Sequence, residues 1–493
     1  MSTSGMRITS EATSKKPRKL TRRHFLGLTG TTIAATVMPG ISVSAEKRQR
    51  PNILFIMVDD LGKEWISCYG AEDIKTPNID ALAETGMRFE NAYSMPQCTP
   101  SRATLLTGQY PWRTGWVNHW DVPRWGVGYF DWKIRQNLTF ARILRTAGYA
   151  TAAVGKWQIN DFRIAPDAMR KHGFDDWCMW TGYETGNPPS GERYMNAYIN
   201  TPKGSKTYKG QFGPDVYTDY LIRFMTDHQD QPMMLYFPMA LTHGPLVATP
   251  AEPNAETKME KHNAMVRYTD RLVGRIVRAL DELKIRDRTI VIFTTDNGSS
   301  GGITGTRNGM KIRGGKAQKT ENGVCAPYIV NCPGFVPKGV VTGALTDFSD
   351  LLPTFAELGE APVPKDLPID GISIAPLLLG KAKDSPRKWI MALGHGAARL
   401  DKDGVRGKVD YTERVIRDKQ YKVWVSESRK ISQLYDLLSD PLEENNLIAS
   451  TKPEHQAAIR KFQAVVDTMP EKDARPRYMP RKPNPWDKKL PTT

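Results

Sequence analysis

The sequence predicts an α/β protein in which a doubly wound, mostly parallel sheet is flanked by helices. Three observations predict this fold. Apolar segments of strand length alternate with segments of helical period along most of the chain. The segments at 52–58 and 289–295 are almost continuously apolar, which is typical of strands buried on both faces of a sheet. Polar side chains with useful chemistry directly follow several of these strands.

The individual elements follow from apolar periodicity and from the residues that start and stop helices. Strands are expected at 52–58, 149–154, 233–240 and 289–295, and helices at 76–85, 139–146, 215–228 and 263–283. Beyond about residue 380 the pattern changes to short strands with charged turns, over 389–425. We therefore predict a main domain at 46–380, a smaller antiparallel α+β subdomain at 381–479, and a flexible tail at 480–493.

The first 45 residues resemble an export signal. Thr21-Arg22-Arg23-His24-Phe25-Leu26 matches a twin-arginine motif, a mildly apolar stretch follows, and small residues precede a cleavage point after Ala45. This order predicts recognition by the twin-arginine export machinery and a periplasmic or extracellular location. A disordered basic N-terminus is the alternative. No other run is apolar and long enough to span a membrane, so a stable membrane span is not expected.

The chain is basic and contains few cysteines. Its formal net charge is +16. Seven Lys/Arg and one Glu in residues 1–45 contribute +6, which leaves +10 on the remaining residues. Such a charge suits a polyanionic partner or a solvated surface. No arginine-rich cluster with interleaved aromatics marks a nucleic-acid face, so nucleic acid is not an expected partner. The five Cys leave both disulfides and buried thiols open.

Four predicted strands are each followed by polar groups that can take part in chemistry. Since the carboxyl ends of parallel strands meet at one edge of a sheet, these groups are expected to lie together. The pairs are Asp59-Asp60, Gly155-Lys156, Thr242-His243 and Asp296-Asn297.

Hard oxygen donors dominate this edge. Asp59, Asp60, Asp296 and Asn297 are ligands that calcium prefers, with magnesium as a lesser possibility. No His/Cys cluster has the spacing of a zinc site. Taken singly, these residues are equally compatible with capping of strand ends or with an ordinary turn.

The segment Cys98-Thr-Pro100-Ser-Arg102 carries the most specific signal. Pro100 fits the first turn of a helix, which puts Cys98 at the helix N-terminus, where free N–H groups attract anions. Arg102 lies one turn further along. A buried structural cysteine is the alternative for an isolated residue of this kind.

With its extension to Leu-Thr-Gly108, this segment resembles the formylglycine-dependent sulfatases of the alkaline-phosphatase-like superfamily. The resemblance runs from Asn52 to about Leu447. It implies that a formylglycine-generating maturation enzyme converts Cys98, and that residue 98 joins Asp59, Asp60, Asp296 and Asn297 in holding one calcium ion. Further landmarks are Gly155-Lys156-Trp157, His243-Gly-Pro245, Asp296-Asn297-Gly298, Gly314-Gly-Lys316 and the segment 434–447.

The resemblance also implies the reaction and the role of each cation. Hydrated formylglycine at position 98 attacks the sulfur of a sulfate ester, with Lys156 at its hydroxyl. Arg102 and Lys316 balance the charge of the sulfate, and His243 binds sulfate and protonates the leaving oxygen. The expected enzyme is a sulfuric ester hydrolase, similar to arylsulfatases, that acts on a sulfated small molecule or polysaccharide.

One position departs from the family pattern. Where the family commonly has His, two residues after Lys156, this chain has Gln158, which cannot act as a general base near neutral pH. Two other functions stay open, the first because it shares the sheet and its acidic edge and the second because of Gln158. One is a phosphoester or phosphonate hydrolase of the same superfamily, and the other is a non-catalytic binding protein for sulfated glycans.

Overall fold

Strand β1 (Asn52–Val58) lies inside a ten-stranded mixed sheet, and all seven of its residues are buried. It pairs in parallel with β9 (Thr289–Thr295) on one side and with β8 (Met233–Pro238) on the other. A strand flanked on both sides and covered on both faces is expected to be mostly apolar. The strand predictions at 52–58 and 289–295 are therefore confirmed residue for residue.

The sheet has the order β13-β2-β12-β9-β1-β8-β4-β5-β6-β7. Its central part, from β9 to β5, is parallel, while β12 runs against both of its neighbours and the β6–β7 hairpin closes the other edge antiparallel. The remaining strands are β2 (Met87–Tyr93), β4 (Ala150–Lys156), β5 (Asp176–Trp180), β6 (Tyr198–Thr201), β7 (Gly204–Thr207), β12 (Cys325–Asn331) and β13 (Val340–Asp347).

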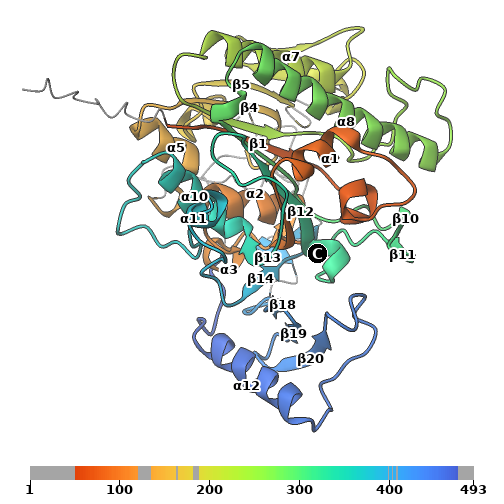
Figure 1. The fold of residues 1–493 in the computed structure, drawn as a ribbon, viewed down its shortest axis with the longest axis vertical. Coiled ribbons are helices and arrows are strands. Elements are labelled where there is room, and N and C mark those ends of the chain that lie inside the picture. The colour runs from red at the N-terminus through yellow and green to blue at the C-terminus, as the bar shows by residue number, and fades with distance from the viewer. Residues whose placement is uncertain are drawn as a thin grey trace, which may run out of the picture. The chain divides into compact units, whose positions relative to one another are not determined.

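Helices cover both faces of the sheet (Figure 1). Alternate residues of β1 point to opposite faces, so Phe55 belongs to one apolar core and Ile56 to another. The first core includes residues of α2 (Cys98–Thr107), α5 (Phe140–Thr146), α10 (Leu351–Leu358) and α11 (Ala375–Leu378). The second includes residues of α1 (Pro77–Glu84), α7 (Gly213–Asp227) and α8 (Lys258–Glu282). The predicted doubly wound α/β architecture is confirmed.

Helix α8 begins at Lys258, five residues before the predicted start at 263. Three of the four residues in its first turn are charged, so apolar periodicity gave little signal there. A capping box fixes the start, because the Thr257 side chain accepts from the Glu260 backbone N–H while the Glu260 side chain accepts from the Thr257 backbone N–H.

The C-terminal part forms the smaller antiparallel sheet that the sequence predicts. Its order is β14-β18-β19-β20, and helix α12 (Pro453–Asp467) packs on β19 and β20. The strands are β14 (Ile390–Leu393), β18 (Arg414–Arg417), β19 (Tyr421–Val425) and β20 (Ile431–Asp436). The domain boundary at 380/381 stays a prediction.

The computed structural model describes residues 50–119, 135–160, 162, 165–180, 182, 188–397, 399–401, 404–406 and 409–475. The predicted signal at 1–45 and tail at 480–493 lie outside these residues. The short elements are β3 (Asn118–His119), β10 (Thr304–Arg307), β11 (Met310–Arg313), β15 (His395–Ala397), β16 (Arg399–Asp401), β17 (Gly404–Arg406), α3 (Pro111–Thr114), α6 (Ala168–Lys171) and α9 (Glu321–Val324).

Two further expectations concern the membrane and the cysteines. Within the described residues, every helix is too short or too polar to cross a bilayer. All five cysteines are free thiols, three of them buried, so the structure favours thiols over the disulfides that the sequence left open.

A buried histidine in α8 should make folding pH-dependent. His262 packs against the ring of Trp65, and burial lowers its pKa to about 4 from the ordinary 6.5. The unfolded chain therefore takes up this proton first, and the stability due to neutral His262 is lost as the pH falls from 6.5 towards 4. Between pH 7 and 4 we expect a loss of about 3 kcal/mol at this residue.

Urea unfolding of the wild type and of His262→Phe across this pH range isolates the effect, because Phe keeps the ring contact and cannot titrate. The stability of the wild type should fall more steeply than that of the variant. Parallel curves would show that His262 is not the group responsible.

Candidate active site

Helix α2 places Cys98 at the carboxyl edge of the sheet. Cys98 is the first residue of the helix, follows the extended residue Gln97, and is fully buried. The hydroxyl of Ser101 holds this turn in place, since it donates to the backbone carbonyl of Asp296 (2.6 Å) and accepts from the backbone N–H of Met95 (3.1 Å). The first turn of α2 is thereby joined to the end of β9, and the predicted position of Cys98 is confirmed.

The four predicted oxygen donors lie at the ends of two adjacent strands. Asp59 and Asp60 follow β1, and Asp296 and Asn297 follow β9, all of them buried. The backbone N–H of Asp60 donates to Asp296 Oδ1 (3.2 Å), and Asn297 Nδ2 donates to Asp60 Oδ1 (2.8 Å). Strand pairing thus brings together carboxylates that are far apart in the sequence.

Two cations, Arg102 and Lys156, are buried against these carboxylates. The Arg102 guanidinium contacts Asp59 Oδ2 (3.0 Å) and Asp296 Oδ2 (3.2 Å), and also donates to the Lys156 carbonyl (2.5 Å). Lys156 Nζ contacts Asp59 Oδ2 (2.5 Å) and lies 3.6 Å from Cys98 Sγ. Arg102 is fully buried, with its guanidinium shared between the carboxylates of Asp59 and Asp296.

Lys316 reaches the site from a loop that follows β11. Its Nζ contacts Asp60 Oδ2 (2.6 Å), and its backbone N–H donates to the Ser299 carbonyl (2.9 Å). The next residue, Ala317, donates its N–H to the Pro96 carbonyl (2.8 Å). The loop is therefore tied both to the segment after β9 and to the segment before Cys98.

Close backbone approaches explain two glycines of the motifs. Gly155, which precedes Lys156, has φ +120°, and a Cβ there would lie 2.0 Å from the Pro238 carbonyl oxygen. At Gly298 a Cβ would lie 1.9 Å from the Asn322 carbonyl oxygen. Only glycine permits both approaches, which bring the strand ends and the Lys316 loop close together.

His243 faces the carboxylates from the segment after β8. Its Nε2 lies 3.7 Å from Asp60 Oδ2, and its Nδ1 lies 2.7 Å from the Gly244 carbonyl oxygen and 3.1 Å from Arg193 Nη1. Sequence reasoning missed Arg193. It belongs to no recognisable motif, and it is placed by stacking on Trp180, 4.0 Å from the ring centroid.

Burial and charge shift the pKa values of the site in opposite directions. Burial would raise the pKa of Asp59, but the positive groups around it, led by Lys156, together outweigh burial and hold the pKa below the usual range. Burial and the charge of Asp59 raise the pKa of Asp296 to about 7. Burial, together with Lys156, lowers the pKa of His243 to about 4, so the imidazole is neutral near pH 7.

The thiol of Cys98 is a poor nucleophile in this setting. Burial, followed by the charges of Asp296 and Asp59, raises its pKa well above the usual range. The unmodified side chain is therefore protonated at neutral pH, whereas cysteine nucleophiles act as thiolates.

The residues present fit a hard cation. Side-chain atoms of Asp59, Asp60, Cys98 and His243 lie within 4.8 Å of one another. The buried Oδ1 of Asn297 has no hydrogen-bond partner among the described residues, as expected for an oxygen that binds a cation. Asp296 lies beside this group, with its carboxylate on Arg102 and the Asp60 N–H.

Comparison with known proteins identifies the family. The family model described as Sulfatase matches residues 51–361. The N-acetylgalactosamine-6-sulfatase of Canis lupus familiaris is 33% identical over 357 residues, which cover 67% of this chain and 66% of that protein. The N-acetylgalactosamine-6-O-sulfatase of Bacteroides thetaiotaomicron is 29% identical over 495 residues, which cover 86% of this chain and 94% of that protein.

A solved structure agrees with this match. The crystal structure of Ps i-CgsB superposes with a TM-score of 0.71 and 26% sequence identity. The superposition covers 87% of this chain and 95% of the Ps i-CgsB chain. The chain belongs to the sulfatase family. The resemblance and the enzyme class inferred from the sequence, a sulfatase, are confirmed.

Removal of Arg102 should destabilise the fold itself. Arg102→Met leaves the buried carboxylates of Asp59 and Asp296 without their shared cation, and loss of one partner of a buried ion pair typically costs about 3–5 kcal/mol. The matched control is Arg145→Met, because Arg145 pairs with Asp175 at the surface and should contribute less than about 1 kcal/mol. Urea unfolding in a chelating buffer compares the two, and equal losses would contradict a structural role of Arg102.

Proposed function

We propose that this protein hydrolyses sulfate esters of a sulfated carbohydrate, with formylglycine at position 98 and one calcium ion. The observation that carries the proposal is the position of Cys98. It opens a helix, its Sγ lies 3.6 Å from both Asp59 Oδ1 and Lys156 Nζ, and the buried oxygen donors of two strand ends surround it. A protonated, buried Cys98 supplies no thiolate, which favours a nucleophile made from Cys98 by a maturation enzyme.

Each of the two groups would supply one kind of chemistry. Formylglycine would provide a hydroxyl nucleophile, and calcium would polarise the sulfate oxygens and neutralise their charge. Asp59, Asp60, Asp296 and Asn297, together with residue 98, would hold the ion. The unpartnered Oδ1 of Asn297 and the carboxylates on two adjacent strand ends support this ligand set.

The remaining side chains of the site would each have a separate role in binding and cleaving the sulfate ester. Lys316 and His243 keep 22% and 25% of their side chains exposed, so an entering sulfate meets them first. Lys156 is buried beside residue 98 and holds the nucleophile in place. Arg102 orients Asp59 and Asp296. In the tautomer that carries its proton on Nε2, with Nδ1 accepting from Arg193, neutral His243 would direct its one N–H to the leaving oxygen.

Relatives support a sulfated carbohydrate as the substrate. Two of them are named for removing the 6-sulfate of N-acetylgalactosamine, and Ps i-CgsB has been solved with k-i-k-neocarrahexaose bound. The basic charge of the chain and the twin-arginine-like segment at 1–45 suit an anionic substrate and a periplasmic or extracellular location.

Relative rates on a sulfate ester and on its phosphate analogue test the proposal. The purified protein should cleave the sulfate ester faster, and Cys98→Ala should lose turnover while it stays folded. In active protein, the peptide that contains residue 98 should weigh about 18 Da less than its Cys form, because O replaces S and two hydrogens are lost. Faster phosphate cleavage would favour the phosphohydrolase, and binding without any cleavage would favour the glycan-binding protein.

Chelation tests the metal site. EDTA should abolish turnover, and calcium should restore it better than zinc, because the proposed ligands are carboxylate and amide oxygens. Asn297→Ala should raise the calcium concentration needed for half-maximal recovery by about tenfold, and Asn254→Ala, the same substitution at an exposed turn, should not. Full activity of the protein in excess EDTA would contradict a metal at this edge.

Substitution of Gln158 tests the second step of the reaction, the release of sulfate. It has a positive φ of 68° and follows Lys156 by two residues. If the absent family histidine limits release of sulfate, pre-steady-state kinetics should show a burst of alcohol and then a slow phase. Gln158→His should then speed the slow phase and leave the burst unchanged. An equal fall in both phases would mean that Gln158 suits the substrate of this enzyme.

A further inference from the structure

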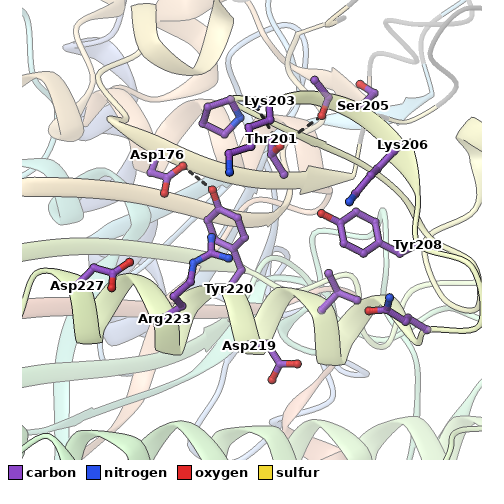
Figure 2. A pocket seen from close by; sticks show the side chains of 14 residues that line it. Asp176, Thr201, Lys203, Ser205, Lys206, Tyr208, Asp219, Tyr220, Arg223 and Asp227 are labelled. Carbon is purple, nitrogen blue, oxygen red and sulfur yellow. Dashed lines mark hydrogen bonds between the residues drawn. The ribbon is translucent and has the colours of Figure 1, made fainter.

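A second groove lies at the opposite end of the strands from Cys98. The β6–β7 hairpin and helix α7 enclose about 960 Å³, and Asp176, the first residue of β5, lines the groove (Figure 2). The other end of β5, Trp180, pairs with Lys156 in the candidate active site. The four residue steps from Asp176 to Trp180 span about 13 Å. A ligand in this groove would therefore occupy a site separate from the one at Cys98.

The charged groups of this groove favour an anion. Lys203 and Lys206 extend from the hairpin towards α7, which carries Arg223 (Figure 2). All three are exposed, and among the described residues none of them forms an ion pair with a carboxylate. These three positive groups are therefore available to a ligand.

One of the three carboxylates of the groove is neutralised by a cation outside it. Asp176 accepts a hydrogen bond from the Tyr220 hydroxyl (2.5 Å), and Asp219 pairs with Arg275. Asp227, at the end of α7, is the third carboxylate that lines the groove. Because only Asp219 is paired with a cation outside the groove, an anion that enters meets three positive side chains against the two carboxylates of Asp176 and Asp227.

Aromatic rings lie beside the cations. Lys206 Nζ lies 4.7 Å from the ring centroid of Tyr208, and the Arg223 guanidinium carbon lies 4.1 Å from that of Tyr220. The face of each ring away from its cation is apolar, and the Tyr208 hydroxyl offers a hydrogen bond, whereas that of Tyr220 already donates to Asp176. Such rings next to cations match a ligand that carries sulfate groups on a ring with apolar faces, as a sulfated sugar does.

We propose that this groove is a second, non-catalytic binding site for a sulfated polysaccharide chain. The class of ligand rests on the function proposed above. A chain held in the groove would keep its other sulfated units near the protein, which raises their effective concentration at the active site without any new contact there. The groove should therefore matter for polymers and not for small sulfate esters.

The experiment compares two double variants that each remove two positive charges. Lys206→Ala/Arg223→Ala changes the groove, and Lys338→Ala/Lys365→Ala is the matched control. Lys338 and Lys365 are exposed, and Lys338 precedes β13, at the edge of the sheet opposite β7. Both are made in the Cys98→Ala protein, so that the polymer is not degraded, and titrated with chondroitin 6-sulfate and with desulfated chondroitin at low salt.

We expect the groove variant to bind chondroitin 6-sulfate about 5- to 10-fold more weakly, while the control stays within about twofold of its parent. Desulfated chondroitin should bind the parent more weakly and lose little in the variant. In active protein, the groove variant should lose kcat/KM on the polymer and keep it on a small aryl sulfate. Equal binding by both variants, or no binding of chondroitin 6-sulfate by the parent, would overturn the proposal.

The binding titration also separates this proposal from the proposed function. If the protein with an intact Cys98 cleaved no sulfate ester but the groove variant still lost binding, the catalytic function would fail and the groove would stand. If cleavage occurred and the groove variant bound the polymer as the control does, only the groove would fail.

Discussion

Mutual neutralisation of buried charges is the constraint on which this site depends. Asp59, Asp60 and Asp296 are buried at the end of two strands, and Arg102, Lys156 and Lys316 lie against them. A single desolvated charge here would be costly, so each group is tolerated because of its partners. The site therefore forms as a unit, and it forms only when α2, β1, β4, β9 and the Lys316 loop are all in place.

This balance of charges determines which ligands the site attracts. Three carboxylates and three cations roughly cancel, so a divalent ion held by the same carboxylates would leave the site positive. Inside the protein the effective dielectric is low, and an excess of positive charge attracts a sulfate group more strongly than it would in water. The partial exposure of Lys316 and His243 gives such a group its entry.

Sequence reasoning predicted the parts of this arrangement that the strands determine. Asp59 and Asp296 were placed together because each follows a buried parallel strand. It could not place Arg193, because a ring on β5 positions this arginine beside His243 and nothing in its local sequence records that contact. Strand β2 (Met87–Tyr93) was also missed, since it contains Arg88, Glu90 and Asn91 and becomes a strand by pairing with β12 and β13. The start of α8, in contrast, was predictable, because the capping box formed by Thr257 and Glu260 is visible in the sequence.

The C-terminal sheet takes part in building the site, although its own residues lie outside it. Glu321 in α9, five residues after Lys316, pairs with Arg417 (2.8 Å) and Lys422 (3.1 Å) of that sheet. Burial would raise the pKa of Glu321, but these cations hold it below its usual range. Glu443 accepts from the Glu321 backbone N–H (2.6 Å) and binds Lys422 (2.9 Å). The segment from Lys316 to Glu321 is therefore fixed at both ends. Lys316 contacts Asp60 in the site, and Glu321 is held by the ion pairs with the C-terminal sheet.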